Sequence, residues 1–402
     1  MRVAINGVGV AGPALAYWLH RFGHEPVLLE RAPALRTGGY VIDYWGMGYE
    51  LAGRMGIVPE LRERGYLIRE LRAVDAEGRT RSSIDVRQMR QALGDSFVSV
   101  ARSDLSAAVL AACGDVETRF GVWVEGLAQD ADGVDATLSD GSTERFDLVV
   151  GADGLHSQVR ALAFGPAERF ERSLGCVVAA VPMRGYPHRD ELAYVLHTVP
   201  RRQVGRFTMR GDESLGLLIC RDDAAGPGAF GGPGDPEPDA AAQQDALRRA
   251  FGGMGWETPE ILSRLGTAED FYCDRVSQIH LPSWSAGRVA LVGDAAACAS
   301  LLAGEGTGLA MIEAYVLAGE LDRHRDDIPA GLSAYEEQLR EFVTDKQRSA
   351  LRMRGFFAPG NALALAMQKI GTRIAAVPFV TRLAARGFND ELELPRYEDD
   401  PR

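Results

Sequence analysis

The chain has 402 residues, of which 46% are hydrophobic and 25% charged, a composition that is typical of folded globular proteins and excludes a fibrous or largely disordered chain. Its length predicts more than one structural unit, because single hydrophobic cores stop growing near roughly 250 to 300 residues. The formal net charge of -12 disfavours binding to nucleic acids and to anionic membranes, since like charges repel.

The cysteines and the hydrophobic pattern indicate the cellular compartment of the protein. The five cysteines are scattered singly, without a CxxC pair or a histidine at metal-ligand spacing, so we expect neither a disulfide framework nor a metal site. No stretch reaches the roughly 20 apolar residues of a membrane-spanning helix. These patterns predict a cytoplasmic protein without a membrane partner.

The chain begins with a strand, a helix and a second strand. Residues 2–6 are a short apolar run, residues 13–23 carry apolar side chains at helical spacing, and residues 26–30 are a second apolar run that ends in an acid. This order, completed within about 30 residues, predicts a parallel βαβ unit.

The turn after the first run is rich in glycine. Gly7, Gly9 and Gly12 form a GxGxxG motif, and Glu30 follows eighteen residues after the last of them. Such glycines permit a tight turn and the approach of a pyrophosphate to the next helix, and an acid at this distance can bind an adenosine ribose. A glycine turn that serves only packing is the alternative, but the surrounding strands and the acid favour a dinucleotide site.

Strand patterns dominate the middle of the chain. Residues 123–154 alternate polar and apolar positions around two turn signals, which predicts a three-stranded antiparallel meander leading into a buried strand. Four β-rich runs between residues 174 and 221 predict one antiparallel sheet. Residues 226–238, rich in glycine and proline, predict a mobile loop or a crossover connection. Beyond residue 304 the pattern is mostly helical to about residue 388, with a break at Pro359.

Two more glycine motifs follow apolar runs. Asp153 stands in the GADG sequence of residues 151–154, where an ordinary strand-to-helix turn is an equal alternative. Asp294 stands in the GDAA sequence of residues 293–296, where a carboxylate after a buried strand could hold a polyol chain. The GEGTG sequence of residues 304–308 opens a long helix whose N-terminal N–H groups could approach a planar ring, or could form only a turn and a cap.

Taken together and in this order, the three motifs resemble those of the group A flavoprotein monooxygenases, the para-hydroxybenzoate hydroxylase-like FAD-dependent aromatic hydroxylases, nearest their polyketide-tailoring and tetracycline-inactivating branch. The resemblance spans nearly the whole chain. It implies an α/β fold, with a Rossmann-like FAD-binding domain, an inserted antiparallel β-sheet substrate domain and C-terminal helices. The expected division is residues 1–72, 98–172 and 273–345 for the FAD-binding domain, 73–97 and 173–272 for the substrate domain, 346–392 for the C-terminal helices and 393–402 for a tail.

The resemblance also implies a non-covalently bound FAD and positions for it. The pyrophosphate is expected at the three glycines of the first motif, the adenosine ribose at Glu30 and the ribityl chain at Asp294, while Asp153 is expected to serve FAD and, transiently, NAD(P)H. For Arg102, a surface charge on a helix is the alternative. The implied cofactor-binding residues are Gly7, Gly9, Gly12, Glu30, Arg31, Gly39, Arg102, Asp153, Asp294, Gly306, Thr307 and Gly308.

Three positions depart from the family pattern near the third motif. Ala297 stands where a histidine is usual, Leu301 stands near the usual proline, and Gly308 replaces an asparagine. The glycines and the aspartate expected to contact FAD are kept, so these departures concern the wall that faces the flavin ring.

The function implied by the resemblance is NAD(P)H-dependent monooxygenation. The protein is expected to insert one oxygen atom from O2 into an aromatic or polyketide-like small molecule through a flavin C4a-hydroperoxide, with NADPH or NADH as a transient reductant. Two alternatives remain: an FAD protein of the same fold that acts as a dehydrogenase, a reductase or a non-redox cyclisation catalyst, and a flavin-binding protein without turnover. A monomer and a homodimer are both compatible with the sequence.

No catalytic base can be identified from the sequence. Four residues in or beside the expected antiparallel sheet are candidates for substrate binding, although aromatic side chains in a sheet are usually core residues and a polar one is more often structural. These four are His197, Arg206, Phe207 and Tyr272.

Overall fold

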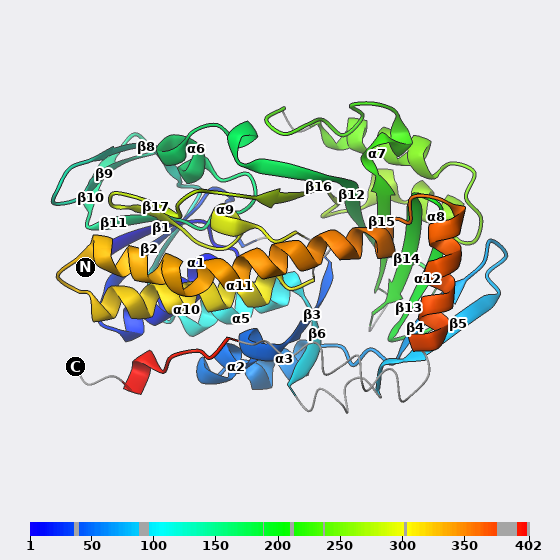
Figure 1. Ribbon diagram of the computed structural model, residues 1–402, viewed down its shortest axis with the longest axis horizontal. Helices are drawn as coiled ribbons and strands as arrows, with labels where there is room; N and C mark the ends of the chain where they lie inside the picture. The colour runs from blue at the N-terminus through cyan, green and yellow to red at the C-terminus, as the bar shows by residue number, and fades with distance from the viewer. Residues whose placement is uncertain are drawn as a thin grey trace.

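The computed structural model describes residues 1–35, 40–87, 96–187, 189–209, 213–235, 238–300, 304–375 and 392–399. Gly39 and Leu301, which the sequence analysis singled out, lie outside these residues. The fold is of the expected α/β class, with a mainly parallel sheet, a larger mainly antiparallel sheet and long C-terminal helices (Figure 1).

The first sheet contains the predicted βαβ unit. Its first two strands and the strand before the GADG motif are parallel and almost wholly buried, which explains why their sequences are apolar throughout. The carboxyl ends of these parallel strands meet at one edge, where ligands bind in open α/β sheets. In spatial order the strands are β17 (Ser285–Ala286), β18 (Val289–Leu291), β11 (Leu148–Gly151), β1 (Arg2–Asn6), β2 (Glu25–Glu30) and β7 (Glu117–Phe120).

Two small sheets accompany the parallel sheet. The predicted meander is confirmed, because three strands pair antiparallel in chain order just before β11. A two-stranded ribbon links the parallel sheet to the second large sheet. The meander strands are β8 (Val124–Gln129), β9 (Val134–Leu138) and β10 (Thr143–Phe146), and the ribbon consists of β3 (Val41–Trp45) and β6 (Phe97–Ala101).

The predicted antiparallel sheet is also confirmed, since all four β-rich runs pair in it. It is larger than the pattern indicated, because a hairpin from an earlier part of the chain extends one edge through a parallel pairing. In spatial order its strands are β16 (Tyr272–Ile279), β12 (Glu171–Arg184), β15 (Glu213–Arg221), β14 (Arg202–Thr208), β13 (Ala193–Val199), β4 (Glu70–Val74) and β5 (Thr80–Asp85).

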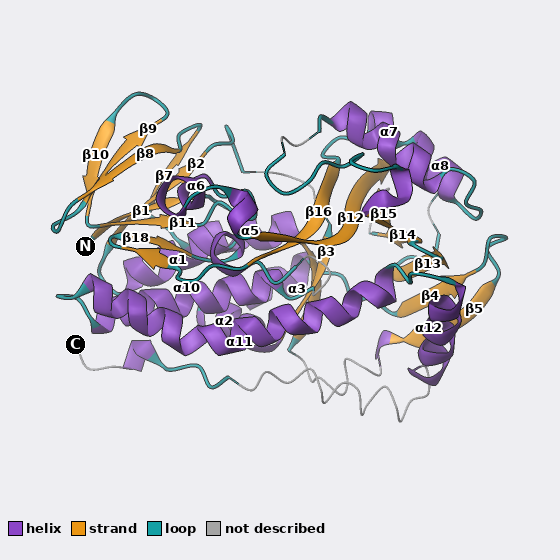
Figure 2. Cartoon of the chain, turned by 45° about the horizontal axis from the view of Figure 1, so that its top comes forward, coloured by secondary structure: helices purple, strands orange, loops and turns teal. Residues whose placement is uncertain are grey.

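The two faces of this seven-stranded sheet have different partners, because side chains alternate along each strand. The inner face, which includes Ala180, Phe207 and Leu215, packs against Val41 of β3 and therefore faces the parallel-sheet part of the molecule. The outer face packs under α7 (Ala240–Phe251) and α8 (Thr258–Ser263), which Figure 2 shows above the strands. Its apolar residues include Val177, Ala179, Val204 and Leu218.

The helices surround both sheets. The last long ones follow the predicted pattern as far as Ala375, including the break near Pro359, and the rest of the predicted helical stretch lies outside the described residues. None of the helices in the described ranges is long and apolar enough to cross a membrane. The helices are α1 (Ala11–Arg21), α2 (Gly46–Arg54), α3 (Val58–Arg64), α5 (Arg102–Ala112), α6 (Gln158–Phe164), α7 (Ala240–Phe251), α8 (Thr258–Ser263), α9 (Asp294–Ala297), α10 (Gly306–Arg323), α11 (Ile328–Phe357) and α12 (Ala362–Ala375).

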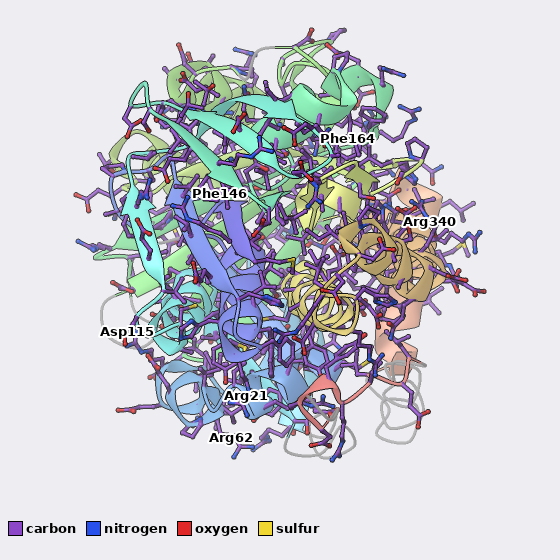
Figure 3. All side chains as sticks on the ribbon, turned by 90° about the vertical axis from the view of Figure 1, so that its left-hand side faces the viewer. Arg21, Arg62, Asp115, Phe146, Phe164 and Arg340 are labelled. Carbon is purple, nitrogen blue, oxygen red and sulfur yellow. The ribbon has the colours of Figure 1, made fainter. Side chains whose placement is uncertain are left out.

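The N-terminus and the last described residues, up to Asp399, lie at the parallel-sheet end of the molecule (Figure 1). Figure 3 looks onto this end, with Asp115 on one flank, Arg340 on the other and Phe146 between them beside the strands. From here α11 extends to the seven-stranded sheet, where Phe357 packs against residues of its inner face. This helix therefore connects the two parts of the molecule.

The glycine- and proline-rich segment is partly packed. Phe230 is buried in the outer-face core, although the sequence composition predicted that this segment buries little. The difference arises because one aromatic side chain can anchor a segment whose other residues are small. Mobility of residues 226–238 stays a prediction, and so do the domain boundaries.

Candidate functional site

The glycine-rich turn after β1 is shaped by close backbone contacts. Gly7 has φ of +118°, and a Cβ atom there would lie 2.5 Å from the carbonyl oxygen of Ala152, while a Cβ atom on Gly12 would collide with the carbonyl oxygen of Gly7. No side chain caps the N-terminus of α1, and its first turn carries no acid. Its free N–H groups can therefore bind an anion.

Arg102 brings a positive charge to the same place. A Cβ atom on Gly9 would lie 4.0 Å from the guanidinium of Arg102, which begins α5. A dinucleotide pyrophosphate requires such a site, in which helix N–H groups, an open glycine surface and a cation converge. The residues present therefore fit the pyrophosphate of FAD.

Glu30 and Arg31, at the end of β2, have different surroundings. The Glu30 carboxylate accepts hydrogen bonds from the N–H groups of Val8 and Ala32, both at 2.8 Å, so it fixes the glycine-rich turn against the end of β2. Arg31 is exposed and lines a cavity described below.

Asp153 holds the GADG loop together. One carboxylate oxygen accepts a hydrogen bond from the Ser157 hydroxyl at 2.5 Å, and the other accepts hydrogen bonds from the Asn6 amide at 3.0 Å and from the N–H groups of Gln158 and Val159. These bonds fasten the loop to the end of β1. The arrangement favours a positioning role for Asp153, and direct service to FAD or NAD(P)H stays a prediction.

Asp294 follows the short strand β18 and lies between the first turns of α1 and α10. Burial raises the pKa of its carboxyl, while the nearby Arg102 guanidinium and a hydrogen bond from the Cys298 thiol lower it. A carboxylate is kept in such a place when a ligand supplies the missing hydrogen bonds. The hydroxyl groups of a ribityl chain can do so.

Two charged residues with no assigned role in the sequence analysis hold the Asp294 turn. The fully buried Arg160 donates to the carbonyl oxygen of Ala295 at 3.0 Å, and the fully buried Glu313 accepts from the N–H group of Gly293 at 2.5 Å. The available signal was a single charge within an otherwise apolar run, which indicates a buried partner without identifying it.

The first turn of α10 contains Gly306, Thr307 and Gly308, and the side chain of the N-cap residue, Glu305, does not cap it. Close packing explains part of this sequence, since a Cβ atom on Gly48 would lie 2.6 Å from the Cα atom of Gly308. Glu305 stands just before the turn, and its carboxylate forms an ion pair with Lys346 of α11 at 2.8 Å. Of the residues that depart from the family pattern, Ala297 is buried in α9.

Two cavities flank this arrangement. The first, of about 30 Å³, lies at the start of α10, and its lining includes Asp43, Trp45, Glu305, Phe342 and Lys346. The second, of about 300 Å³, lies beside the end of β2 and the GADG loop. Its lining includes Arg31, His156, Phe230, Asp274 and Arg275.

The four substrate candidates lie on opposite faces of the seven-stranded sheet. Phe207 is on the inner face and stacks on Tyr194, with ring centroids 4.5 Å apart. Tyr272 contacts Tyr40 of the parallel-sheet part, with ring centroids 5.8 Å apart. His197 is on the outer face, where its ring packs against Trp256.

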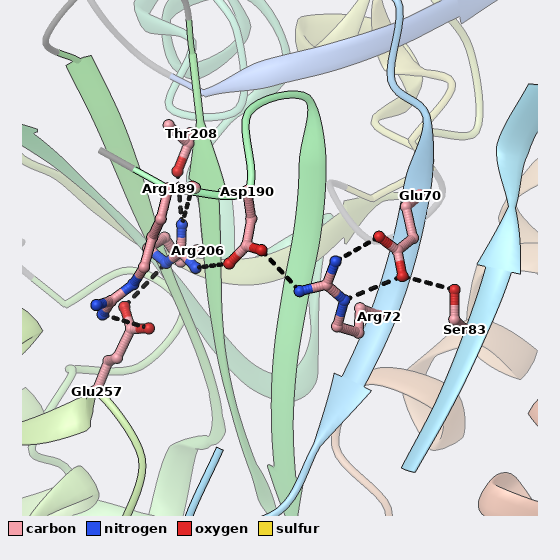
Figure 4. Close-up of polar contacts among 8 residues, drawn as sticks. All are labelled: Glu70, Arg72, Ser83, Arg189, Asp190, Arg206, Thr208 and Glu257. Carbon is pink, nitrogen blue, oxygen red and sulfur yellow. Dashed lines mark hydrogen bonds and ion pairs between the residues drawn. The ribbon is translucent and has the colours of Figure 1, made fainter. Parts of the chain in front are cut away.

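Arg206 also lies on the outer face and is fully buried. It pairs with Asp190 at 2.7 Å and Glu257 at 2.9 Å, in a network that continues through Arg72 to Glu70 (Figure 4). His197 and Arg206, two of the four substrate candidates, therefore do not lie on the face that meets the parallel-sheet part. Each strand sends alternate residues to opposite faces, and the sequence did not show which set faces inward.

Comparison with known proteins points to one family. A family model described as "FAD binding domain" matches residues 1–349. A flavin-dependent monooxygenase from an unknown prokaryotic organism is 32% identical over 406 residues, which cover 99% of both chains. A flavin-dependent monooxygenase of Legionella longbeachae is 30% identical over 417 residues, covering 99% of this chain and 98% of the relative.

Solved structures agree with this assignment. The crystal structure of tetracycline destructase Tet(51) is 29% identical, with a TM-score of 0.82 over 98% of this chain and 99% of that one. The structure of Klebsiella pneumoniae HpxO complexed with FAD and uric acid has a TM-score of 0.76 over 96% of both chains. At 21% identity, this second likeness shows the fold alone.

Proposed function

The chain belongs to the FAD-binding-domain family of flavin-dependent monooxygenases, and from this we propose that it uses NAD(P)H and O2 to insert one oxygen atom into an aromatic or polyketide-like small molecule. One observation carries the proposal. The N-termini of α1 and α10, Arg102 and the buried carboxyl of Asp294 converge at the edge of the parallel sheet, as an extended FAD requires.

In this proposal the chain's residues divide the binding of FAD among them. The first turn of α1 and Arg102 hold the pyrophosphate, Asp294 accepts hydrogen bonds from the ribityl hydroxyls, and the first turn of α10 takes the pyrimidine edge of the ring. Arg160 and Glu313 keep the Asp294 turn in place. The bound flavin supplies the redox chemistry, namely the activation of O2 at its C4a carbon.

The protein's contribution to the reaction is orientation and the exclusion of water. The inner face of the seven-stranded sheet presents aromatic side chains, among them Tyr194, Phe207 and Tyr272, toward the parallel-sheet part. An apolar wall over the ring would keep water from the reacting atoms and hold a flat aromatic substrate. This supports an aromatic or polyketide-like substrate.

The second cavity suits a transient reductant. Its volume of about 300 Å³ is within the range of small-molecule sites. Arg275, which is buried, lines it, and its Nε atom has no hydrogen-bond partner among the residues that the structure describes. Arg275 pairs with Glu171 at 3.6 Å, whereas the exposed Arg31 offers positive charge to the phosphates of a nicotinamide nucleotide. We therefore assign NAD(P)H to this cavity.

Coupling between substrate and reductant tests the proposal. We expect the purified holoenzyme to oxidise NADPH slowly alone and at least about tenfold faster with a bound hydroxylated aromatic or tetracycline, with one atom of 18O2 found in the product. Asp294→Ala, which we expect to lose FAD, is the negative control. Arg31→Gln should raise the KM for NADPH several-fold and leave the FAD content unchanged, whereas Arg87→Gln, a distant exposed arginine, should change neither.

Other results would favour the alternatives. Flavin reduction by the organic substrate under anaerobic conditions without NAD(P)H would indicate a dehydrogenase. Conversion of the substrate with neither NAD(P)H nor O2 consumed would indicate a non-redox cyclisation catalyst. Either result would overturn monooxygenation while leaving the FAD site intact.

A further inference from the structure

The first cavity contains a carboxyl group that the proposed FAD site does not use. Asp43 lies on β3, two residues after Val41, so the two side chains point to the same face of the strand. Val41 packs against Phe207 and Leu215 of the inner face. Asp43 therefore lies between the seven-stranded sheet and the start of α10, where the flavin ring and the substrate would meet.

The Asp43 carboxyl has few hydrogen-bond partners for its degree of burial. One oxygen accepts from the Ser99 hydroxyl at 2.5 Å, and no other donor contacts the carboxyl among the residues that the structure describes. Burial raises the pKa of Asp43, and the hydrogen bond from Ser99 opposes this effect. The residue is half-buried and lines the cavity, so a donor on a bound ligand can reach the second oxygen.

The cavity lining that the structure describes around Asp43 is largely aromatic and contains no unpaired cation. Trp45 lines the same cavity and stacks on Phe97, and the Asp43 charge acts on the Tyr194 hydroxyl across from it. Lys346 is the single cation among the described residues that line the cavity, and it pairs with Glu305. Arg206, which could have bound an acid, lies on the outer face.

We infer that Asp43 accepts a hydrogen bond from a neutral hydroxyl group of the substrate, and that the enzyme selects phenolic or enolic compounds over aromatic carboxylic acids. The inference rests on the proposed function for the position of the substrate over the flavin. Selection follows because an ionised acid has no hydrogen to donate to Asp43 and meets no unpaired cation in the described lining, whereas a phenol can donate to the second oxygen of Asp43.

Two matched probes test the inference: 2-naphthol, which is neutral near pH 7, and 2-naphthoate, which is ionised. Binding to the FAD holoenzyme is measured from the change in flavin fluorescence, so no turnover is needed. We expect the naphthol to bind at least tenfold more tightly than the naphthoate. Equal affinities, a preference for the naphthoate, or no binding of either probe would overturn the inference, whatever the variants do.

The variant Asp43→Asn tests the residue itself. It keeps the shape of the side chain and replaces one acceptor oxygen with an amide group that donates, so the preference for the naphthol should fall to less than threefold, with unchanged FAD content. Asp140→Asn, an exposed aspartate in a turn, is the matched control for net charge and should keep the full preference. If Asp43→Asn keeps the full preference for the naphthol over the naphthoate, Asp43 does not bind the substrate hydroxyl. Loss of FAD in the same variant would then show that Asp43 serves the flavin or the fold instead.

The two proposals fail in different ways. If the naphthol binds through Asp43 and no tested compound stimulates NADPH oxidation, monooxygenation fails and the selectivity stands. If hydroxylated and carboxylated aromatics stimulate NADPH oxidation equally and bind equally, the selectivity fails and monooxygenation stands.

Discussion

Glu313 shows how a single buried acid can organise a binding turn. It lies within the apolar helix α10, its carboxylate holds the N–H group just before Asp294, and one of its oxygens has no hydrogen-bond partner among the described residues. Burial raises its pKa well above the usual value for glutamate, a shift that hydrogen bonds from Gly293 and Tyr335 oppose. Burial therefore outweighs these hydrogen bonds and favours the protonated form of the carboxyl.

This pKa shift predicts that Glu313→Gln stabilises the folded protein relative to the parent, and that this stabilisation increases with pH. Below about pH 4 both the folded and the unfolded chain hold the proton, whereas above it the unfolded chain loses the proton and the folded chain keeps it, so stability falls as pH rises toward the raised folded pKa. Glutamine has no proton to lose. The melting temperature of the variant relative to the parent should therefore increase from about pH 5 to about pH 8.

The size of this effect reports the folded pKa. The difference amounts to about 1.4 kcal/mol for each unit by which the folded pKa exceeds the unfolded one within the pH range sampled. Thermal unfolding of the holoenzyme provides the measurement. Glu341→Gln, at an exposed position of α11, should show no such trend. Parallel pH profiles for Glu313→Gln and the parent would contradict the prediction.

The start of α10 combines a helix dipole with an ion pair. Its uncapped N–H groups favour negative charge, and the carboxylate of Glu305 beside them is balanced by Lys346 from α11. The pair therefore contributes little net charge where the pyrimidine edge of the flavin is expected. Removing one partner should leave a net charge beside the ring.

Two single variants and their combination test this balance. Lys346→Gln should lower the midpoint potential of the bound flavin by on the order of 30 mV, about 1.4 kcal/mol for two electrons, because the remaining carboxylate disfavours a negatively charged reduced ring. Glu305→Gln should raise the potential by a similar amount, and the double variant should return near the parent value. Lys369→Gln alters the chain's other lysine, on α12, and should change nothing. Equal potentials in all variants would place the ring away from this pair.

Contacts between segments that are distant in sequence hold the two large sheets together and fix the C-terminal segment. α11 reaches from the parallel sheet to the seven-stranded sheet, and its Gln347 donates to the carbonyl oxygen of Ile279 in β16. At the other end, the C-terminal segment returns to α10, where Tyr397 is buried against Gly319 and donates a hydrogen bond to Glu320 at 2.6 Å.

Docking of the C-terminal segment should stabilise the whole molecule without affecting the cofactor. Tyr397→Ala should cost about 3 kcal/mol, since it removes a buried aromatic ring, and Tyr397→Phe about 1 kcal/mol, since it removes only the hydroxyl group. At roughly 2–4 °C for each kcal/mol, the alanine variant should melt several degrees below the parent. The ratio of flavin to protein absorbance should stay unchanged in both. A lower ratio in the phenylalanine variant would show coupling to the FAD site.

The cofactor motifs could be predicted because their parts are close together along the chain. The glycine spacing, the apolar runs around it and the acid at the end of β2 are all contained in the first thirty residues, and Gly7 and Gly12 are each required by a close backbone contact. The meander and the antiparallel sheet were predictable for the same reason, since hairpin neighbours are also neighbours in sequence.

The rest depended on partners that are far apart in sequence. Arg160, Glu313 and Lys346 each contact a residue of another element, and no local pattern identifies such a partner. The alternation of side chains along a strand predicts that His197 and Tyr194 lie on opposite faces of β13. Which face meets the parallel-sheet part is decided by packing of the inner face against β3. The sequence by itself thus determined the cofactor class and the fold class, because both depend on local backbone requirements. Only the tertiary structure decided which side chains surround the substrate, because that depends on how separately formed sheets and helices pack together.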